Sequence, residues 1–138
     1  MSAVEPAEGT CLVAVYGTLR RGHANAHWLA DALYLGTDVS HAIVLYDLGA
    51  YPGAKWADSD GIEIEVYRID TRTLHALDQL EEFDPADPAG SLYVRGQLQT
   101  AFGRAWVYLY QGVVVGHRPI REGRWNPRAD SPGSAALS

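Results

Sequence analysis

Residues 12–19 read LVAVYGTL, and this stretch decides the fold because it joins an apolar run to a glycine-bearing loop. The run Leu12–Tyr16 is short and is bounded by Gly17, a pattern that predicts a buried β-strand. Glycine at a strand end lets the backbone approach a ligand closely, and successive N–H groups in such a turn can bind an anion. A plain strand-to-loop turn has the same residue types and is the commoner meaning of the pattern.

The clearest helix of the chain follows a strand predicted for residues 61–69. Asp70 or Thr71 caps this helix, and residues 84–88, which contain two prolines, end it. Three leucines recur at helical spacing and define its apolar face: Leu74, Leu77 and Leu80.

Strands are predicted on both sides of this helix from apolar alternation and aromatic or β-branched residues. The further strands are predicted at residues 92–100, at residues 104–110 and at residues 35–46, where the chain forms one or two strands. A short helix is expected from Asn25 to Leu33, and residues 50–53 have the composition of a turn. About six or seven strands and two or more flanking helices predict an α+β fold. Hairpin-like neighbours predict a small mixed, mostly antiparallel β-barrel.

The 138 residues are expected to form one domain, because this length is close to that of an average domain. Residues 11–126 contain all of the predicted elements. The ends, residues 1–10 and 127–138, are rich in small residues and proline without apolar periodicity, so we expect flexible tails.

The composition is typical of a globular protein that acts on small molecules. Hydrophobic residues make up 47% of the chain and charged residues 20%. The formal net charge of -6 argues against a nucleic-acid-binding protein, which normally has a basic stripe.

The cellular compartment is expected to be the cytoplasm. The first ten residues lack the apolar region of a signal peptide, and no apolar run approaches the roughly 20 residues that cross a bilayer. The single cysteine, Cys11, excludes an internal disulfide and fits a reducing compartment.

Glu81 is the candidate acid/base of the sequence. It lies four residues after Leu77 and therefore at the edge of the apolar face, near the C-terminal end of the helix. The helix dipole and partial burial both disfavour a charged carboxylate there, so they raise its pKa toward the range that a general acid/base needs. A solvated glutamate in an acidic run with Glu82 and Asp84 is the simpler alternative.

Tyr93 and Arg95 are predicted to share one face of a strand, because strand side chains alternate. A hydroxyl and a guanidinium side by side could hold a carboxyl group of a substrate or of the catalytic glutamate. A solvated pair on the outer face fits the spacing as well.

Other chemistries have weaker support in the sequence. His23 and His27 are four residues apart, but no third ligand has matching spacing, so no metal site is predicted. Cys11 is expected to pack rather than react, and the late Trp125 is expected to pack against the sheet.

Taken in order, these motifs resemble those of the γ-glutamyl cyclotransferase-like family, over about residues 11–126. The Tyr-Gly-Thr-Leu start and the Leu-Asp-x-x-Glu helix at this separation are together fairly specific. The matching segments are Tyr16–Leu19, Tyr51–Gly53, Leu77–Glu81, Tyr93–Arg95, Ala105–Tyr108 and Gly123–Trp125.

The resemblance implies a ligand pocket at one mouth of a small barrel. It implies that Tyr16, Gly17, Thr18 and Leu19 hold the γ-glutamyl group and that Glu81 is the catalytic carboxylate. It further implies that Tyr93 lines the pocket and that Gly53 lies opposite. Two departures are plain: Glu82 stands where family members often have glycine, and residues 83–91 form a longer link than usual.

The hypothesis from the sequence is an enzyme that cyclises a γ-glutamyl group to 5-oxoproline and releases an amine, with Glu81 moving the protons. This chemistry needs no metal, nucleotide or other cofactor. The alternatives are a non-catalytic module that binds small metabolites in the same pocket and an interaction domain. The leaving amine and the oligomeric state stay open, although the acidic residues 82–87 would complement a cationic leaving group.

Overall fold

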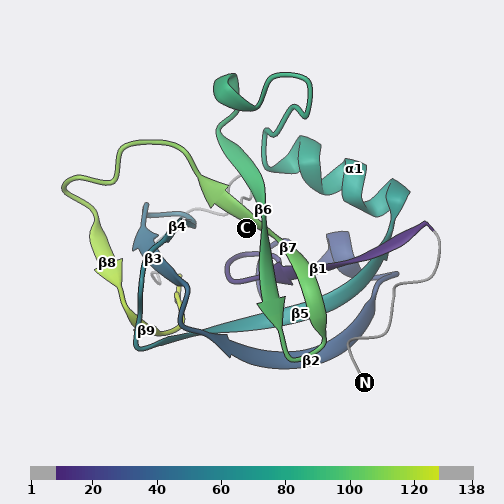
Figure 1. Ribbon diagram of the computed structural model, residues 1–138, viewed down its shortest axis with the longest axis horizontal. Coiled ribbons are helices and arrows are strands. Elements are labelled where there is room, and N and C mark those ends of the chain that lie inside the picture. The colour runs from purple at the N-terminus through teal and green to yellow at the C-terminus, as the bar shows by residue number, and fades with distance from the viewer. Residues whose placement is uncertain (1–8, 128–138) are drawn as a thin grey trace.

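The computed structural model describes residues 9–127, which fold into two β-sheets and one α-helix (Figure 1). The larger sheet has the strand order β2-β5-β1-β7-β6, and β9 pairs with the first two residues of β5, Gly61 and Ile62. Its strands are β1 (Thr10–Val15), β2 (Leu33–Ser40), β5 (Gly61–Asp70), β6 (Tyr93–Thr100), β7 (Gly103–Tyr110) and β9 (Glu122–Gly123). All of its ladders are antiparallel except β1 with β7 and β5 with β9.

The smaller sheet has the order β4-β3-β8 and is antiparallel throughout. Its strands are β3 (Ile43–Asp47), β4 (Pro52–Trp56) and β8 (Arg118–Ile120). Two short 3₁₀ helices, η1 (Ala26–Leu29) and η2 (Pro88–Gly90), lie in the connections. The structure therefore confirms a mixed, mostly antiparallel α+β fold.

Strand β1 is buried on both of its faces, which explains its unbroken apolar sequence. Leu12, Ala14 and Tyr16 belong to the core between the two sheets. The alternate residues Val13 and Val15 belong to a second core, which lies beneath the α-helix. The prediction that residues 12–16 form a buried strand is confirmed up to Val15, and Tyr16 follows as the first residue of the loop.

Helix α1 (Thr71–Leu80) lies across one face of the larger sheet (Figure 1). The Asp70 side chain caps it by accepting a hydrogen bond from the Thr73 amide at 2.7 Å. At the other end Glu82 has a φ of 54°, and its amide donates to the Gln79 carbonyl at 3.1 Å. The next amide, that of Phe83, donates back to Asp78 at 2.8 Å, and the two bonds form a Schellman end.

Two local predictions were wrong. Residues 25–33 form only the 3₁₀ turn η1, because Leu33 and its successors pair with β5 and this pairing outweighs helix propensity. Residues 50–53 are not all turn, because β4 already begins at Pro52 and pairs with Asp47.

The count of six or seven strands was also low, since the described residues contain nine, of which β8 and β9 are very short. Within residues 9–127 the ladders run as two separate sheets and do not close into a ring, so the closed barrel stays a prediction. One α-helix is present in the same residues, where two or more helices were expected. The predicted tails lie almost wholly outside the described residues.

Candidate active site

Glu81 is the C-cap residue of α1 and is completely buried, with an exposed fraction of 0%. Its amide donates to the Leu77 carbonyl at 2.9 Å, so its backbone is fixed to the last turn of the helix. Leu77 is itself buried in the core beneath the helix. The alternative of a solvated glutamate is therefore wrong for Glu81, whereas Glu82 and Asp84 are exposed.

Three buried tyrosines lie within electrostatic range of the Glu81 carboxyl group. The pKa of each phenol is raised, mainly by burial, and the charge of Glu81 raises all three further. The three are Tyr16, Tyr93 and Tyr108. Tyr16 belongs to the core between the sheets and the other two to the core beneath α1, so Glu81 lies where the two cores meet.

Hydrogen bonds to the backbone fix two of these tyrosines. The Tyr16 hydroxyl donates to the Tyr108 carbonyl at 2.6 Å and accepts from the Ala54 amide at 3.2 Å. The Tyr93 hydroxyl donates to the Pro52 carbonyl at 2.8 Å. Both tyrosines therefore bind strand β4.

Gly53 lies on β4 between the two backbone groups that these tyrosines bind. A Cβ atom on Gly53 would come within 2.7 Å of the Tyr110 Cβ and 3.1 Å of the Leu48 Cδ1. This close approach requires glycine, because the Tyr110 Cβ is attached directly to the backbone of β7 in the larger sheet and cannot move aside. Gly53 therefore lets β4 approach Tyr110 of β7 closely.

The loop that follows β1, Tyr16–Leu19, is buried along its whole length. Its shape is set by the Arg20 amide, which donates to the Gly17 carbonyl at 3.0 Å, and by the Asn25 amide, which donates to Thr18 at 2.8 Å. The amides of Gly17 and Leu19 make no hydrogen bond to another residue of the described part of the chain. Buried amides of this kind normally have a partner, so they are candidates for binding an anionic ligand.

Arg20 was not among the residues that we predicted to belong to the site. Its side chain is only 3% exposed, and its Nε donates to the Gly17 carbonyl at 3.1 Å while Nη2 donates to the Trp125 carbonyl. Burial lowers its pKa, and the charges of Glu65 and Glu63 oppose that effect. The signal in the sequence was its position directly after the Tyr-Gly-Thr-Leu motif.

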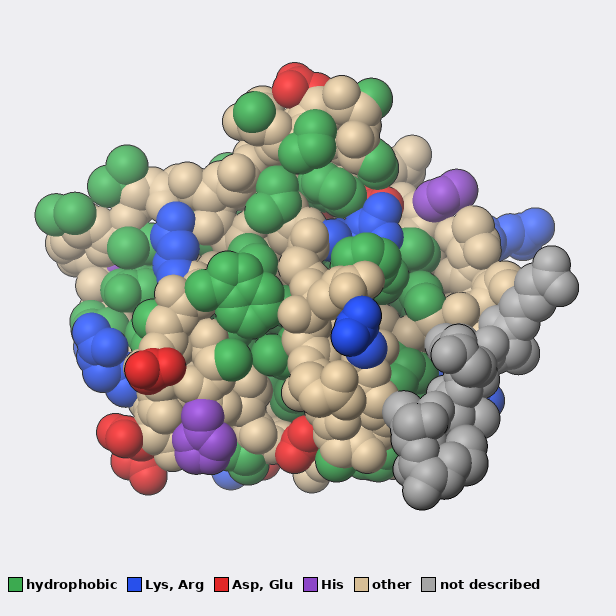
Figure 2. All heavy atoms as spheres, in the orientation of Figure 1, with side chains coloured by type: hydrophobic (Ala, Val, Ile, Leu, Met, Phe, Trp, Pro, Cys, Tyr) green, Lys and Arg blue, Asp and Glu red, His purple; other side chains and the backbone are tan. Residues whose placement is uncertain are grey.

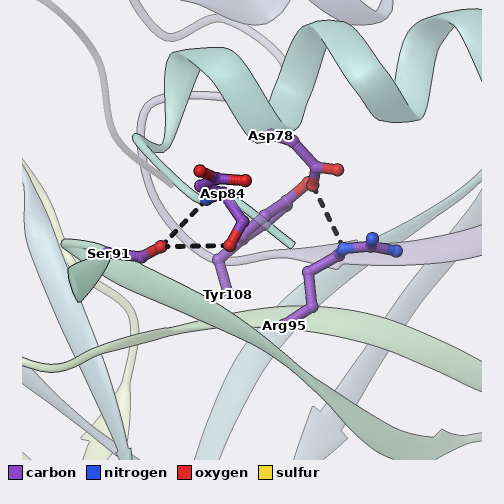
Figure 3. A network of polar contacts seen from close by, with 5 residues as sticks. All are labelled: Asp78, Asp84, Ser91, Arg95 and Tyr108. Carbon is purple, nitrogen blue, oxygen red and sulfur yellow. Dashed lines mark hydrogen bonds and ion pairs between the residues drawn. The ribbon is translucent and has the colours of Figure 1, made fainter. Parts of the chain in front are cut away.

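A second polar cluster lies beneath α1 and holds Asp78 rather than Glu81 (Figure 3). The Asp78 Oδ1 accepts from the Tyr108 hydroxyl at 2.6 Å and pairs with the Arg95 Nε at 3.1 Å. The Arg95 guanidinium also lies 4.6 Å from the centre of the Trp106 ring. The prediction that Arg95 could hold the catalytic glutamate is therefore wrong, because its ion-pair partner is the aspartate one helical turn earlier.

Two further predictions concern single residues. Trp125 packs as expected, at 1% exposure, and its Nε1 donates to Asp47 at 3.3 Å. Cys11 is half-buried beside the core beneath α1, and burial raises the pKa of its thiol.

Residues 9–127 contain no group of three or more potential metal ligands, and no helix among them could span a membrane.

The fold and this site define a class of small α+β proteins in which a buried glutamate ends a helix packed on a mostly antiparallel sheet. The profile of one family, described as "Gamma-glutamyl cyclotransferase, AIG2-like", matches residues 13–127. The chain belongs to this family.

Individual relatives agree with that assignment. The γ-glutamylcyclotransferase family protein YtfP of Escherichia coli is 41% identical over 114 residues, which are 83% of this chain and 95% of that protein. Its solution structure superposes with a TM-score of 0.67 over the same shares of the two chains. A more distant relative, the γ-L-glutamyl-butirosin B γ-glutamyl cyclotransferase of Niallia circulans, is 33% identical over 70% of this chain and 64% of that protein.

Proposed function

We propose that this protein cyclises the γ-glutamyl group of an amide to 5-oxoproline and releases the amine, with Glu81 as the general acid/base. The single observation that supports this most is the complete burial of Glu81 among three tyrosines. Burial disfavours a charged carboxylate, and a carboxyl group that gains and loses a proton near neutral pH suits proton transfer. Membership of the γ-glutamyl cyclotransferase family supports the reaction class.

The reaction itself is intramolecular. The α-amine attacks the δ-carbonyl carbon, the new C–N bond closes a five-membered ring, and the bond from that carbon to the leaving nitrogen breaks. Two protons move from the α-ammonium group to the leaving nitrogen, which departs as an ammonium ion. Glu81 carries protons between the two nitrogens, so the enzyme supplies a bent substrate and proton transfer.

The loop after β1 would bind the glutamyl moiety. The amides of Gly17 and Leu19 have no acceptor within the described chain, so they can bind the α-carboxylate or the oxyanion that forms during attack. Thr18, which lies between them, and Tyr16 complete this wall. Gly53 and Tyr93 would form the opposite wall, which keeps the substrate close to Glu81.

A panel of γ-glutamyl amides with 5-oxoproline detection by mass spectrometry tests the proposal. Glu81→Gln should reduce turnover by roughly 10²- to 10⁴-fold while the thermal unfolding midpoint changes little. Glu122→Gln is the matched control, because Glu122 is exposed on β9. Undiminished turnover in Glu81→Gln would refute the role of this residue. If no amide yields 5-oxoproline but one binds by calorimetry, the protein is a binding module.

A further inference from the structure

An ion pair between Asp78 and Arg95 lies beneath α1 (Figure 3). Asp78 precedes Glu81 by one helical turn, and the two residues are only 4% and 0% exposed. The amide of Glu81 still donates to Leu77, so Glu81 continues the helical path of Asp78. Residues three apart on such a path are neighbours, with about 5–6 Å between their Cβ atoms. Two carboxyl groups are therefore buried close together, and each disfavours the charge of the other unless a cation compensates one of them.

Arg95 compensates the charge of Asp78 from the sheet. It is paired with Tyr108 across β6 and β7, so the two side chains share one face of the sheet. Both meet the Oδ1 atom of Asp78, to which the Tyr108 hydroxyl donates at 2.6 Å and the Arg95 Nε lies at 3.1 Å. The Oδ2 atom is buried without a hydrogen-bond partner in residues 9–127, so the charge of Asp78 depends on these two side chains.

Two aromatic rings hold the Arg95 guanidinium beside Asp78. Its Cζ atom lies 5.1 Å from the centre of the Phe83 ring and 4.6 Å from that of Trp106. The Arg95 side chain is only 15% exposed. On the face drawn in Figure 2, basic side chains over β6 and β7 lie among hydrophobic ones. Water and salt screen a charge weakly in such surroundings, so Arg95 acts on its neighbours more strongly than a surface arginine does.

The field of this ion pair extends to the phenols beside Glu81. Burial is the main cause that raises the pKa of Tyr108. The hydrogen bond to Asp78 and the charges of Asp78 and Glu81 raise it further, whereas the charge of Arg95 lowers it. Tyr108 is thus within range of all three charged groups. The same Tyr108 accepts the Tyr16 hydroxyl on its carbonyl, so the pair is joined to the loop after β1 as well.

The other ionisable groups around the two carboxyl groups leave this balance unchanged near neutral pH. Four of them stay neutral because their pKa values are raised, mainly by burial: Tyr16, Tyr93, Tyr108 and Cys11. Tyr67 of β5 belongs to the core beneath α1, and its hydroxyl donates to Glu65 at 3.0 Å. On the solvent side of Asp78, His75 and Asp84 line the same hollow, but they are exposed and therefore screened. Arg95 is the cation that meets the buried carboxylates.

We propose that Arg95 is a positioning residue for Glu81: by neutralising Asp78 it keeps a second negative charge away from the site, so that Glu81 can ionise and accept a proton near neutral pH. The inference rests on the proposed cyclisation, because control of this kind matters for a Glu81 that exchanges protons during turnover. No bond forms or breaks at Asp78 or Arg95, and neither exchanges a proton with the substrate.

Variants that change one charge should move the ionisation of Glu81 in opposite directions. Arg95→Met leaves Asp78 uncompensated, so the acidic limb of the pH profile of kcat/KM should shift upward by about one pH unit. Asp78→Asn keeps an acceptor for the Tyr108 hydroxyl but removes the negative charge, so the limb should shift downward by a similar amount. The double variant Arg95→Met/Asp78→Asn has neither charge and should return close to the wild-type profile.

Two further variants separate this electrostatic role from a structural one. Arg95→Lys keeps the positive charge and should keep the acidic limb near its wild-type position, even where weaker stacking lowers stability. Arg104→Met is the matched control, because Arg104 is an exposed arginine on β7. A structural role alone would lower stability without opposite shifts of the limb, and that result would overturn the inference. If Arg95→Met does not fold, an unmoved limb in Asp78→Asn overturns it equally.

NMR titration of isotope-labelled glutamate carboxyl carbons separates this inference from the proposed function. The signal of Glu81 is identified by its absence in Glu81→Gln. Opposite shifts of its titration midpoint in Arg95→Met and Asp78→Asn support the inference even if no γ-glutamyl amide is turned over. An unmoved midpoint in both variants refutes it, and 5-oxoproline formation that is lost in Glu81→Gln would then leave the proposed function intact.

Discussion

The guanidinium group of Arg20 donates hydrogen bonds to the carbonyl oxygens of Gly17 and Trp125, and Trp125 lies 105 positions after Arg20 in the sequence. Trp125 is buried and is bound in turn by Asp47, so the loop after β1 is fixed to the last described segment. Arg20 is therefore a positioning residue of the proposed binding loop, because it sets the direction of the Gly17 peptide without reaching the substrate itself.

Replacing Arg20 should weaken substrate binding more than it slows chemistry. Arg20→Met leaves the Trp125 carbonyl without this donor, whereas the Gly17 carbonyl keeps the amide of residue 20, so the free energy of unfolding should fall by about 1–3 kcal/mol. A displaced loop should raise KM several-fold more than it lowers kcat. Urea unfolding and steady-state kinetics measure both effects. Arg21→Met is the matched control, because Arg21 is exposed, and equal effects in the two variants would contradict the positioning role.

The local elements near this loop could be predicted because their signals are local. The buried strand before Gly17, the capped helix and the position of Glu81 at its end all follow from periodicity and capping residues. Arg95 could not be assigned a partner in the same way. Strand alternation places it on one face, but only the packing of α1 decides that Asp78 meets it there.

The failures of prediction have the same physical origin. Pro52 and Gly53 have the composition of a turn, and pairing with the preceding strand β3 makes them a strand. Residues 25–33 have helical spacing, and pairing with β5 decides their final part. Arg20 is a polar residue in a loop by sequence, and its burial depends on a carbonyl that is distant in the chain.

Gly53 offers a test of how tightly β4 packs on the tyrosines. Gly53→Ala would place a methyl group 2.7 Å from the Tyr110 Cβ, so β4 must move away or the strands must separate. Overpacking of this kind should lower the free energy of unfolding by about 1–3 kcal/mol. Movement of β4 also lengthens its hydrogen bonds to Tyr16 and Tyr93, so kcat/KM should fall. Chemical denaturation and kinetics of the alanine variant check the two effects, and wild-type values for both would refute the proposed close contact.

The buried tyrosines predict a steep loss of stability in alkali. The pKa values of Tyr16, Tyr93 and Tyr108 are raised by burial above the value of about 10 in the unfolded chain. Above about pH 10 the unfolded chain therefore binds fewer protons than the folded protein, and stability falls as pH rises. Each tyrosine contributes about 1.4 kcal/mol per pH unit, or about 4 kcal/mol for the three.

Urea unfolding followed by tryptophan fluorescence between about pH 8 and pH 11 measures this slope. Stability from these three groups should be fully present below about pH 10. Tyr108→Phe should reduce the slope by about 1.4 kcal/mol per pH unit, because one titrating group is removed. A free energy of unfolding that stays constant up to about pH 11 would show that the phenols titrate normally in the folded protein.

Glu82→Gly tests the cost of the left-handed backbone conformation at the end of α1. Glycine relieves the positive φ of 54°, but it also gains freedom in the unfolded chain, so a net increase in the free energy of unfolding of about 0.5–1 kcal/mol is expected. The Schellman hydrogen bonds of the helix end remain, because they use only backbone groups. Chemical denaturation of the wild-type protein and the glycine variant measures this effect. A less stable variant would show that the Glu82 side chain makes compensating contacts that outweigh its strained backbone.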